Sequence, residues 1–337
     1  MTRGFLGRGT GNAIVAAATL AAVSLIGLAS EPITAENAGS LVEASRIDVG
    51  LHVFELAFLS DAQLAVADSE RTAFWDLESG TSYVEFTRYE IGRVIGISPG
   101  RSNLAVYTAS RNAEIWTVDP LEKQFTLCSI EDTEWPRAAF SPNGRHLAIT
   151  NRWNDIEVWN LETRGRRHVL TGHHSNLFAL AFSPDGRCLA TGGGTSSRDD
   201  AGESTIGVWD VSSGDRLAWL PTEDLGDNHD LTFTVEGSRL ISGGQRRMLA
   251  WDASTWERDY DSGPSYPGSY GLTLSPNGML LAVATDNRRL RVVDAASLRA
   301  VRDVYVGAEL VDVAFSPDGT RLAASCTDGT VRVYHVP

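Results

Sequence analysis

A four-residue turn, Ser-Pro-Asp/Asn-Gly, recurs along the chain at residues 141–144, 183–186, 275–278 and 316–319. Proline presets φ at the first corner of such a turn, Asp or Asn is favoured at the next, and glycine takes the position with positive φ. Each copy follows a short apolar run, so each predicts a tight hairpin between two strands. The 32 glycines and 12 prolines of this 337-residue chain fit a fold made of many short strands and turns.

The turn belongs to a longer repeat. When degenerate copies after residues 58, 97 and 233 are included, the last apolar residue before each turn lies at 58, 97, 140, 182, 233, 274 and 315, which gives intervals of 39, 43, 42, 51, 41 and 41 residues. Downstream, a leucine opens a second strand, and a third-strand residue, usually tryptophan, follows it by 11 or 12 residues in six units. The fourth unit has a polar insertion at 194–204, and a further apolar stretch after the tryptophan predicts a fourth strand.

Seven units of four strands favour an all-β, seven-bladed β-propeller of four-stranded antiparallel blades. A four-stranded sheet cannot bury both of its faces alone, whereas sheets stacked around an axis cover one another. The chain ends after the third strand of the last unit, and residues 40–50 match residues 297–307 in length and in both end residues. We therefore expect the N-terminal segment to supply the missing strand of the last blade.

These features resemble the WD-repeat β-propeller family over residues 40–337. The resemblance is carried by the turns described above together with Trp75-Asp76, Trp159-Asn160, Trp209-Asp210, Trp251-Asp252, Gly172-His173 and Asp328-Gly329-Thr330. It implies a non-enzymatic protein-interaction module. It also implies a structural hydrogen-bond network in the fourth unit, formed by His173, Thr191 and Trp209, with Asp199, Asp200 or no aspartate as the fourth member.

Residues 1–30 have the pattern of a signal peptide. Arg3 and Arg8 precede an apolar run at 13–29, and Gly27 and Ala29 are a plausible small-residue cleavage pair. This predicts export to a periplasmic or extracellular space, with 31–39 as a linker. Two alternatives remain: the run at 13–29 is an uncleaved membrane anchor, or the true start lies elsewhere and the protein is a cytoplasmic scaffold.

Charge and cysteine usage exclude several classes of function. The formal net charge is −14 and Lys123 is the only lysine, which disfavours a nucleic-acid partner. Cys128, Cys188 and Cys326 are far apart in sequence, so neither a zinc-finger array nor a disulfide framework is expected. We expect no cofactor, no metal and a monomeric propeller. His168, His173 and His174 lack the spacing of a metal site, and the acids near residues 224–230, including Asp224, Asp227 and Asp230, are interpreted as a solvated loop.

The turns between the second and third strands are rich in arginine, although the chain as a whole is acidic. Since these turns and the loops leading into each blade share one face of a propeller, we expect an acidic protein or peptide to bind there, because Arg and Trp are enriched in binding hot spots. The candidate residues are Arg111, Arg152, Trp153, Trp135, His174, Arg246, Arg247, Arg288 and Arg289, with Arg71 and Arg198 in related turns.

Two other interpretations of these features stay open. The arginines could be solvated turn residues in a sequence that uses almost no other cation. Alternatively, the propeller could be a hydrolase- or lactonase-type enzyme with its site at the central channel. Such an enzyme requires acids or histidines to converge at the channel mouth, whereas a docking face requires arginines and aromatic residues.

Overall fold

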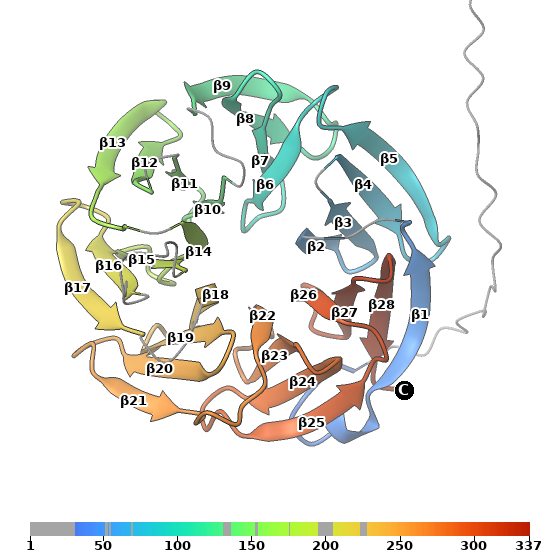
Figure 1. The fold of residues 1–337 in the computed structure, drawn as a ribbon. Coiled ribbons are helices and arrows are strands. Elements are labelled where there is room, and N and C mark those ends of the chain that lie inside the picture. The colour runs from blue at the N-terminus through green and yellow to red at the C-terminus, as the bar shows by residue number, and fades with distance from the viewer. Residues whose placement is uncertain are drawn as a thin grey trace, which may run out of the picture.

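The computed structural model describes residues 31–50, 53, 55–68, 70–130, 136–151, 154–174, 176–194, 205–222 and 228–337. Seven four-stranded antiparallel sheets surround a central axis as blades (Figure 1), so the predicted seven-bladed propeller is confirmed. The expected signal peptide or anchor at 1–30 lies outside the described residues. Within the described residues, no helix is long and apolar enough to cross a membrane.

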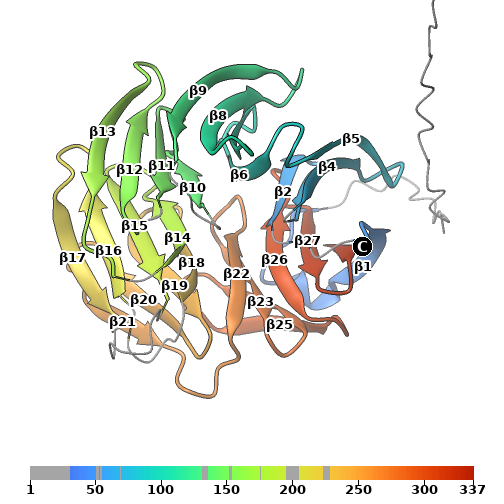
Figure 2. The ribbon, with the colours of Figure 1, turned by 45° about the horizontal axis from the view of Figure 1, so that its top comes forward.

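Within each blade the strands follow one another from the axis to the rim (Figures 1 and 2). The first three blades are β2 (Glu55–Ser60), β3 (Gln63–Ala67), β4 (Arg71–Asp76) and β5 (Thr81–Thr87); β6 (Arg93–Ile97), β7 (Asn103–Tyr107), β8 (Asn112–Thr117) and β9 (Lys123–Ser129); and β10 (Ala138–Phe140), β11 (His146–Thr150), β12 (Ile156–Asn160) and β13 (Gly165–Leu170). The next three are β14 (Leu177–Phe182), β15 (Cys188–Gly193), β16 (Thr205–Asp210) and β17 (Arg216–Pro221); β18 (Asn228–Phe233), β19 (Arg239–Gly244), β20 (Met248–Asp252) and β21 (Arg258–Asp261); and β22 (Ser269–Leu274), β23 (Leu280–Thr285), β24 (Arg289–Asp294) and β25 (Ala300–Tyr305).

The seventh blade is built from both ends of the chain. It contains β26 (Leu310–Phe315), β27 (Arg321–Cys326) and β28 (Thr330–His335), and its outer strand is β1 (Val42–Asp48). β1 pairs antiparallel with β28, with Val42 opposite His335 and Asp48 opposite Thr330. The predicted closure by the N-terminal strand is confirmed, and the ring has no open seam.

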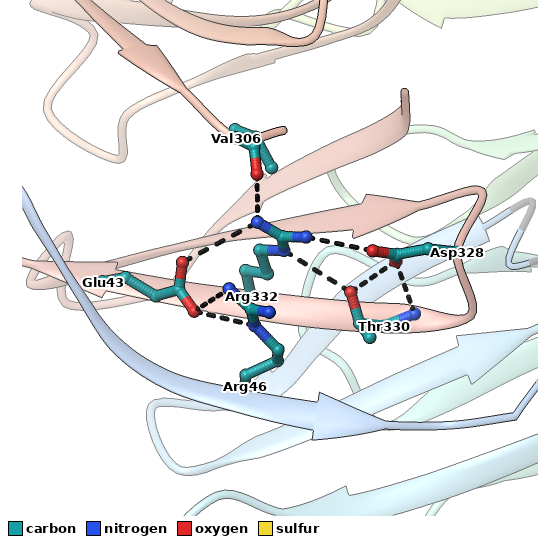
Figure 3. Close-up of polar contacts among 6 residues, drawn as sticks. All are labelled: Glu43, Arg46, Val306, Asp328, Thr330 and Arg332. Carbon is teal, nitrogen blue, oxygen red and sulfur yellow. Dashed lines mark hydrogen bonds and ion pairs between the residues drawn. The ribbon is translucent and has the colours of Figure 1, made fainter. Parts of the chain in front are cut away.

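Charged side chains reinforce this closure (Figure 3). Arg332 on β28 is buried, donates to the backbone carbonyl of Val306 in blade 6, and pairs with the carboxylate of Asp328 at 3.0 Å. Its guanidinium also lies 3.9 Å from Glu43 on β1, and Arg46 holds the same Glu43 carboxylate at 2.9 Å. One cluster therefore joins β1, β28 and the neighbouring blade.

The segment before β1, expected to be a linker, is packed against blades 6 and 7. Ile33 is 1% exposed and its backbone amide donates to the carbonyl of Gly319 at 2.9 Å. Ala38 opens a short 3₁₀ turn, η1 (Ala38–Ser40), and is fully buried in the same apolar cluster. This segment lengthens the N-terminal contact with the ring.

The repeated turns have the geometry that their residues predict. The glycines of the four Ser-Pro-Asp/Asn-Gly turns have φ between 69° and 72°. In each turn the serine hydroxyl donates to the Asp or Asn side chain two residues on and accepts the backbone amide five residues on; in the Ser316 turn these distances are 2.6 and 2.9 Å. The degenerate turn that begins at Ser98 has the same geometry, because Arg101, which stands where the other turns have glycine, has a positive φ of 57°.

The apolar core lies between neighbouring blades, in seven clusters. The second and third strands of each blade contribute most of it, because their side chains contact the blade on either side. The outer strand β21 was not identified from the sequence: its four residues, Arg-Asp-Tyr-Asp, carry no apolar run.

Candidate functional site

Antiparallel order places the arginine-rich turns on one face of the ring. The turn between the second and third strands of a blade and the loop leading to the next blade lie at the same strand ends, opposite the Ser-Pro-Asp/Asn-Gly turns. We call this side the arginine face. Of its candidate residues, Arg152, Trp153, Trp135 and Arg198 fall outside the described residues.

Three arginines of this face are exposed. Arg246 forms no hydrogen bond or ion pair with the rest of the described chain. Arg111 and Arg288 both have positive φ, 62° and 63°, and the Arg288 guanidinium lies 3.7 Å from Glu309. His174, on the loop before the fourth blade, is also exposed. These four side chains come from blades 2, 4, 5 and 6.

Other arginines of the face are engaged within or beside their own blades. Arg71 pairs with Glu85 at 2.6 Å and donates to the Val49 carbonyl at 2.9 Å. Arg247 pairs with Asp261 on the outer strand at 2.8 Å, and its side chain is only 18% exposed. The Arg289 guanidinium lies over the Tyr305 ring, 5.7 Å from its centroid. The exposed arginines in the described part of this face are therefore Arg246, Arg288 and Arg111.

The polar network of the fourth blade is enclosed in the core. Thr191 Oγ1 accepts from Trp209 Nε1 at 2.8 Å, lies 2.7 Å from His173 Nε2 and donates to the Gly207 carbonyl at 3.2 Å. The tautomer of His173 sets which atom donates across the 2.7 Å contact between His173 Nε2 and Thr191 Oγ1. Burial lowers the pKa of His173 to about 4, with a smaller contribution from His174. The network therefore holds a neutral imidazole and serves the structure of the blade.

In blades 2 and 3 the indole N–H of the third-strand tryptophan donates to a glutamate instead of a threonine. Trp116 Nε1 donates to Glu114, and Trp159 Nε1 donates to Glu157, both at 3.0 Å and both two residues apart on one strand. This Glu-x-Trp spacing is visible in the sequence of both units.

A group of charged residues from blades 1, 3, 5 and 7 lies at the central channel. Asp230 on β18 and Asp312 on β26 are equivalent positions, each three residues before the last apolar residue of an innermost strand. Each carboxylate accepts two backbone amides, one from the next residue and one from the neighbouring blade: Leu272 for Asp230 at 2.8 Å, and Leu56 for Asp312 at 2.9 Å. Glu55, at the same position of the first blade, pairs with Arg137 at 3.0 Å.

Enclosure in the ring changes how these carboxyls titrate. Burial raises the pKa of Asp230 to about 6. Burial, followed by repulsion from Asp230, raises the pKa of Asp312 to about 7. The interpretation of Asp230 as part of a solvated acidic loop is wrong, because its strand turns the side chain toward the channel and the next blade. The missed signal was an acid at the same offset in units 1, 5 and 7.

Other polar and aromatic residues make contacts within their own parts of the fold. Tyr266, on the loop before blade 6, is half-buried under the Arg291 guanidinium, which lies 5.0 Å from its ring centroid. His168 lies 3.1 Å from the Ser212 carbonyl on the outer part of blade 4. The described residues include no group of three or more His, Cys, Asp or Glu side chains placed to hold a metal ion. The three cysteines are free thiols in blades 2, 4 and 7.

The ring of seven blades, closed by an N-terminal strand, defines a β-propeller with one face of arginine-bearing turns and a charged central channel. The profile of the WD domain, G-beta repeat, matches residues 165–210 and 304–335. These matches and the seven repeated blades show that the chain belongs to the WD-repeat β-propeller family.

Relatives cover different parts of the ring. An uncharacterised WD repeat-containing protein of Synechocystis is 30% identical over 44% of this chain and 40% of its own length. The β subunit of a guanine nucleotide-binding protein from Zea mays is 29% identical over 58% of this chain and 53% of its own. A WD repeat-containing protein 26 homolog of Arabidopsis thaliana is 35% identical over 44% of this chain and 24% of its own. The chain thus spans about half or less of the length of these relatives.

Proposed function

We propose that this chain is a non-enzymatic interaction propeller that binds an acidic protein or peptide on its arginine face. The observation that carries the proposal is that Arg111, Arg246 and Arg288 present exposed guanidiniums from three separate blades on one side of an acidic ring. A guanidinium can hold a carboxylate or phosphate in two parallel hydrogen bonds, so several on one face favour an anionic surface.

The centre of the proposed contact is the pair formed by Arg246 and Arg288 on adjacent blades. Arg247 and Arg289 follow them directly in sequence but are engaged by Asp261 and Tyr305. Arg247 and Arg289 help to fix the conformation of the two turns, while Arg246 and Arg288 remain accessible to a partner. Exposed His174 extends the same face onto blade 4.

Two considerations favour docking over catalysis. The channel aspartates each bind two backbone amides, as parts of the wall would. The matched β subunit is by its name one chain of an assembly, which is in keeping with an interaction role here. We also propose export, on the basis of the apolar run at 13–29; sequencing the N-terminus of the mature protein from its native host tests this, and an intact Met1 start would contradict it.

The docking proposal is tested by capture with matched variants. Arg246→Ser/Arg288→Ser removes two exposed cations from the arginine face. Arg145→Ser/Arg187→Ser removes two cations from the opposite face, where the side chains are 63% and 84% exposed. Both variants have the same net charge, so a difference between them reports position and not overall electrostatics.

We expect wild type and Arg145→Ser/Arg187→Ser to retain the same partner from the native host, and Arg246→Ser/Arg288→Ser to lose it. Binding should weaken as salt rises, because exposed charges are screened. Equal capture by all three proteins would show that these arginines are solvated turn residues and that the binding surface lies elsewhere.

A further inference from the structure

A cavity of about 330 Å³ lies at the central channel and extends between the first two blades. Its wall is mainly apolar, with Leu56 from β2, Val94 and Ile95 from β6, and Phe178 and Leu180 from β14. Small side chains on β3, Ala65 and Ala67, leave the space beside blade 1 unfilled. This volume is at the lower end of the range of small-molecule sites.

One buried hydroxyl in this wall has no partner. Thr72 on β4 lines the cavity, is 0% exposed, and its Oγ1 forms no hydrogen bond within the described residues. Thr72 lies three residues before Trp75, and the residue with the same offset from the corresponding Trp, Val or Tyr occupies the equivalent position in each other blade. In these six blades the equivalent residue is apolar and also 0% exposed: Ala113, Ile156, Ile206, Met248, Leu290 and Val331. A buried hydroxyl without a partner is costly, so a polar residue at this position indicates a group that it contacts.

The charged residues of the channel form two sides of opposite sign. On the side of blades 1 to 3 are Arg93, Arg137 and Glu55, with a formal charge of +2 − 1 = +1. On the side of blades 5 and 7 are Asp230 and Asp312, with a formal charge of −2 when both are ionised. Arg137 Nε is buried and lacks a partner among the described residues.

Glycine lets the innermost strands of blades 6 and 7 pack closely beside Asp312. Gly271 on β22 lies between them in the ring, and a Cβ there would come within 2.8 Å of Asp312 Oδ1 and 3.0 Å of its Cα. The two carboxylates of the acidic side are close enough to repel each other.

We propose that this cavity binds a small zwitterion, an α-amino acid whose mainly apolar side chain ends in a hydrogen-bonding group. The ammonium group lies against Asp230 and Asp312, the carboxylate lies against Arg137, and the side chain extends along the alanines of blade 1 toward Thr72. The site is separate from the arginine face and does not depend on the proposed protein partner.

Four related probes test the proposed charge contacts: L-tyrosine, tyramine, which lacks the carboxylate, 3-(4-hydroxyphenyl)propionate, which lacks the ammonium group, and L-phenylalanine, which lacks the hydroxyl. Titration calorimetry at pH 8 keeps both aspartates largely ionised, given pKa values of about 6 and 7. We expect saturable binding of L-tyrosine, and a loss of about tenfold or more for tyramine and for the propionate, since each loses one charge-assisted contact.

Variants of Thr72 test the location. Thr72→Ile places in blade 1 the side chain found at this position in blades 3 and 4, so it fills the cavity without a new polar group; we expect an equal or higher melting temperature and at least a tenfold loss of affinity. Thr72→Val removes only the hydroxyl, and should abolish the preference for L-tyrosine over L-phenylalanine.

Variants of the acids test the orientation. Asp230→Asn/Asp312→Asn should weaken the binding of L-tyrosine and tyramine but should not weaken the binding of the propionate, which has no ammonium group and is itself an anion. The absence of saturable heat with L-tyrosine would show that the cavity holds only water and would overturn the proposal. So would unchanged affinity in Thr72→Ile, or equal binding of all four probes.

Discussion

The carboxylate of Asp312 on β26 accepts the backbone amide of Leu56 on β2 at 2.9 Å, across 256 residues of sequence. This bond ties the innermost strands of the last and first blades, while β1 closes the same seam at the rim. Asp230 forms the equivalent bond to Leu272 between blades 5 and 6. The channel acids therefore belong to the ring's structure as well as to the proposed ligand site.

The titration of these two acids should make stability fall as pH rises from about 4 to about 7. Their pKa values, about 6 for Asp230 and about 7 for Asp312, exceed the ordinary value near 3.9 of an unfolded chain. The folded state then binds more protons than the unfolded state, so this stabilisation is complete below about pH 4 and is lost as pH rises through 7. The groups facing them are Arg137, Glu55 and the amides already named.

Urea denaturation at several pH values checks this dependence. From pH 5 to pH 8 the unfolding free energy of Asp230→Asn/Asp312→Asn should rise relative to that of the wild type, because asparagine does not ionise. A difference that is constant with pH would contradict the raised pKa values.

The rim closure should depend far more on Arg332 than on Glu43. Arg332→Met keeps the packing of the aliphatic stem but leaves the buried Val306 carbonyl without its donor. We expect the unfolding free energy to fall by about 2–3 kcal/mol. This is less than the loss expected when a fully buried ion pair is broken, because the partner Asp328 is 41% exposed. Glu43→Gln, a matched control at 3.9 Å, should cost less than about 1 kcal/mol. Equal effects in urea melts would show that the pairing with β1 dominates.

Deleting residues 31–50 should lower the melting temperature sharply. The deletion removes β1, which leaves the outer edge of β28 unpaired, and it removes Ile33 and Ala38 from the cluster under blades 6 and 7. Calorimetry of the truncated and full chains measures the change. A melting curve that stays where it was would show that the ring is held closed by blade packing alone.

The network in blade 4 should be sensitive to loss of one oxygen. Thr191→Val leaves Trp209 Nε1 and His173 Nε2 buried without a partner, and we expect a loss of about 2–4 kcal/mol. Thr81→Val, on the exposed outer strand β5, is the control and should change stability little. If both substitutions have the same small effect, the network contributes little to the fold.

Acid should destabilise the protein through His173. Its pKa of about 4 lies below the value near 6.5 of an unfolded histidine, so the unfolded state binds the additional proton between these values. Stability from this group is present above pH 6.5 and is lost as pH falls toward 4. NMR titration of the imidazole should find it neutral at pH 5.5, and a charged ring at that pH would contradict the assignment.

Much of the fold could be read from local sequence. The Ser-Pro-Asp/Asn-Gly turns, the third-strand tryptophans and the match of residues 40–50 to 297–307 gave seven blades and their closure, because turn geometry and strand period depend on near neighbours. The grouping of His173, Thr191 and Trp209 came from the family pattern. These three residues belong to one blade, so their spacing along the chain could be compared directly with the family pattern.

Only the tertiary structure decided which residues meet at the channel and which arginines of the arginine face are paired with an acid. Arg137 reaches Glu55 from two blades away, and Asp312 meets Leu56 only because the ring closes. Arg246 and Arg247 look alike in sequence, yet only Arg247 has Asp261 opposite it. The sequence determined which residues each blade carries, whereas the packing of seven blades around one axis determined which of their charges meet, because Coulomb and hydrogen-bond energies depend on separation in space.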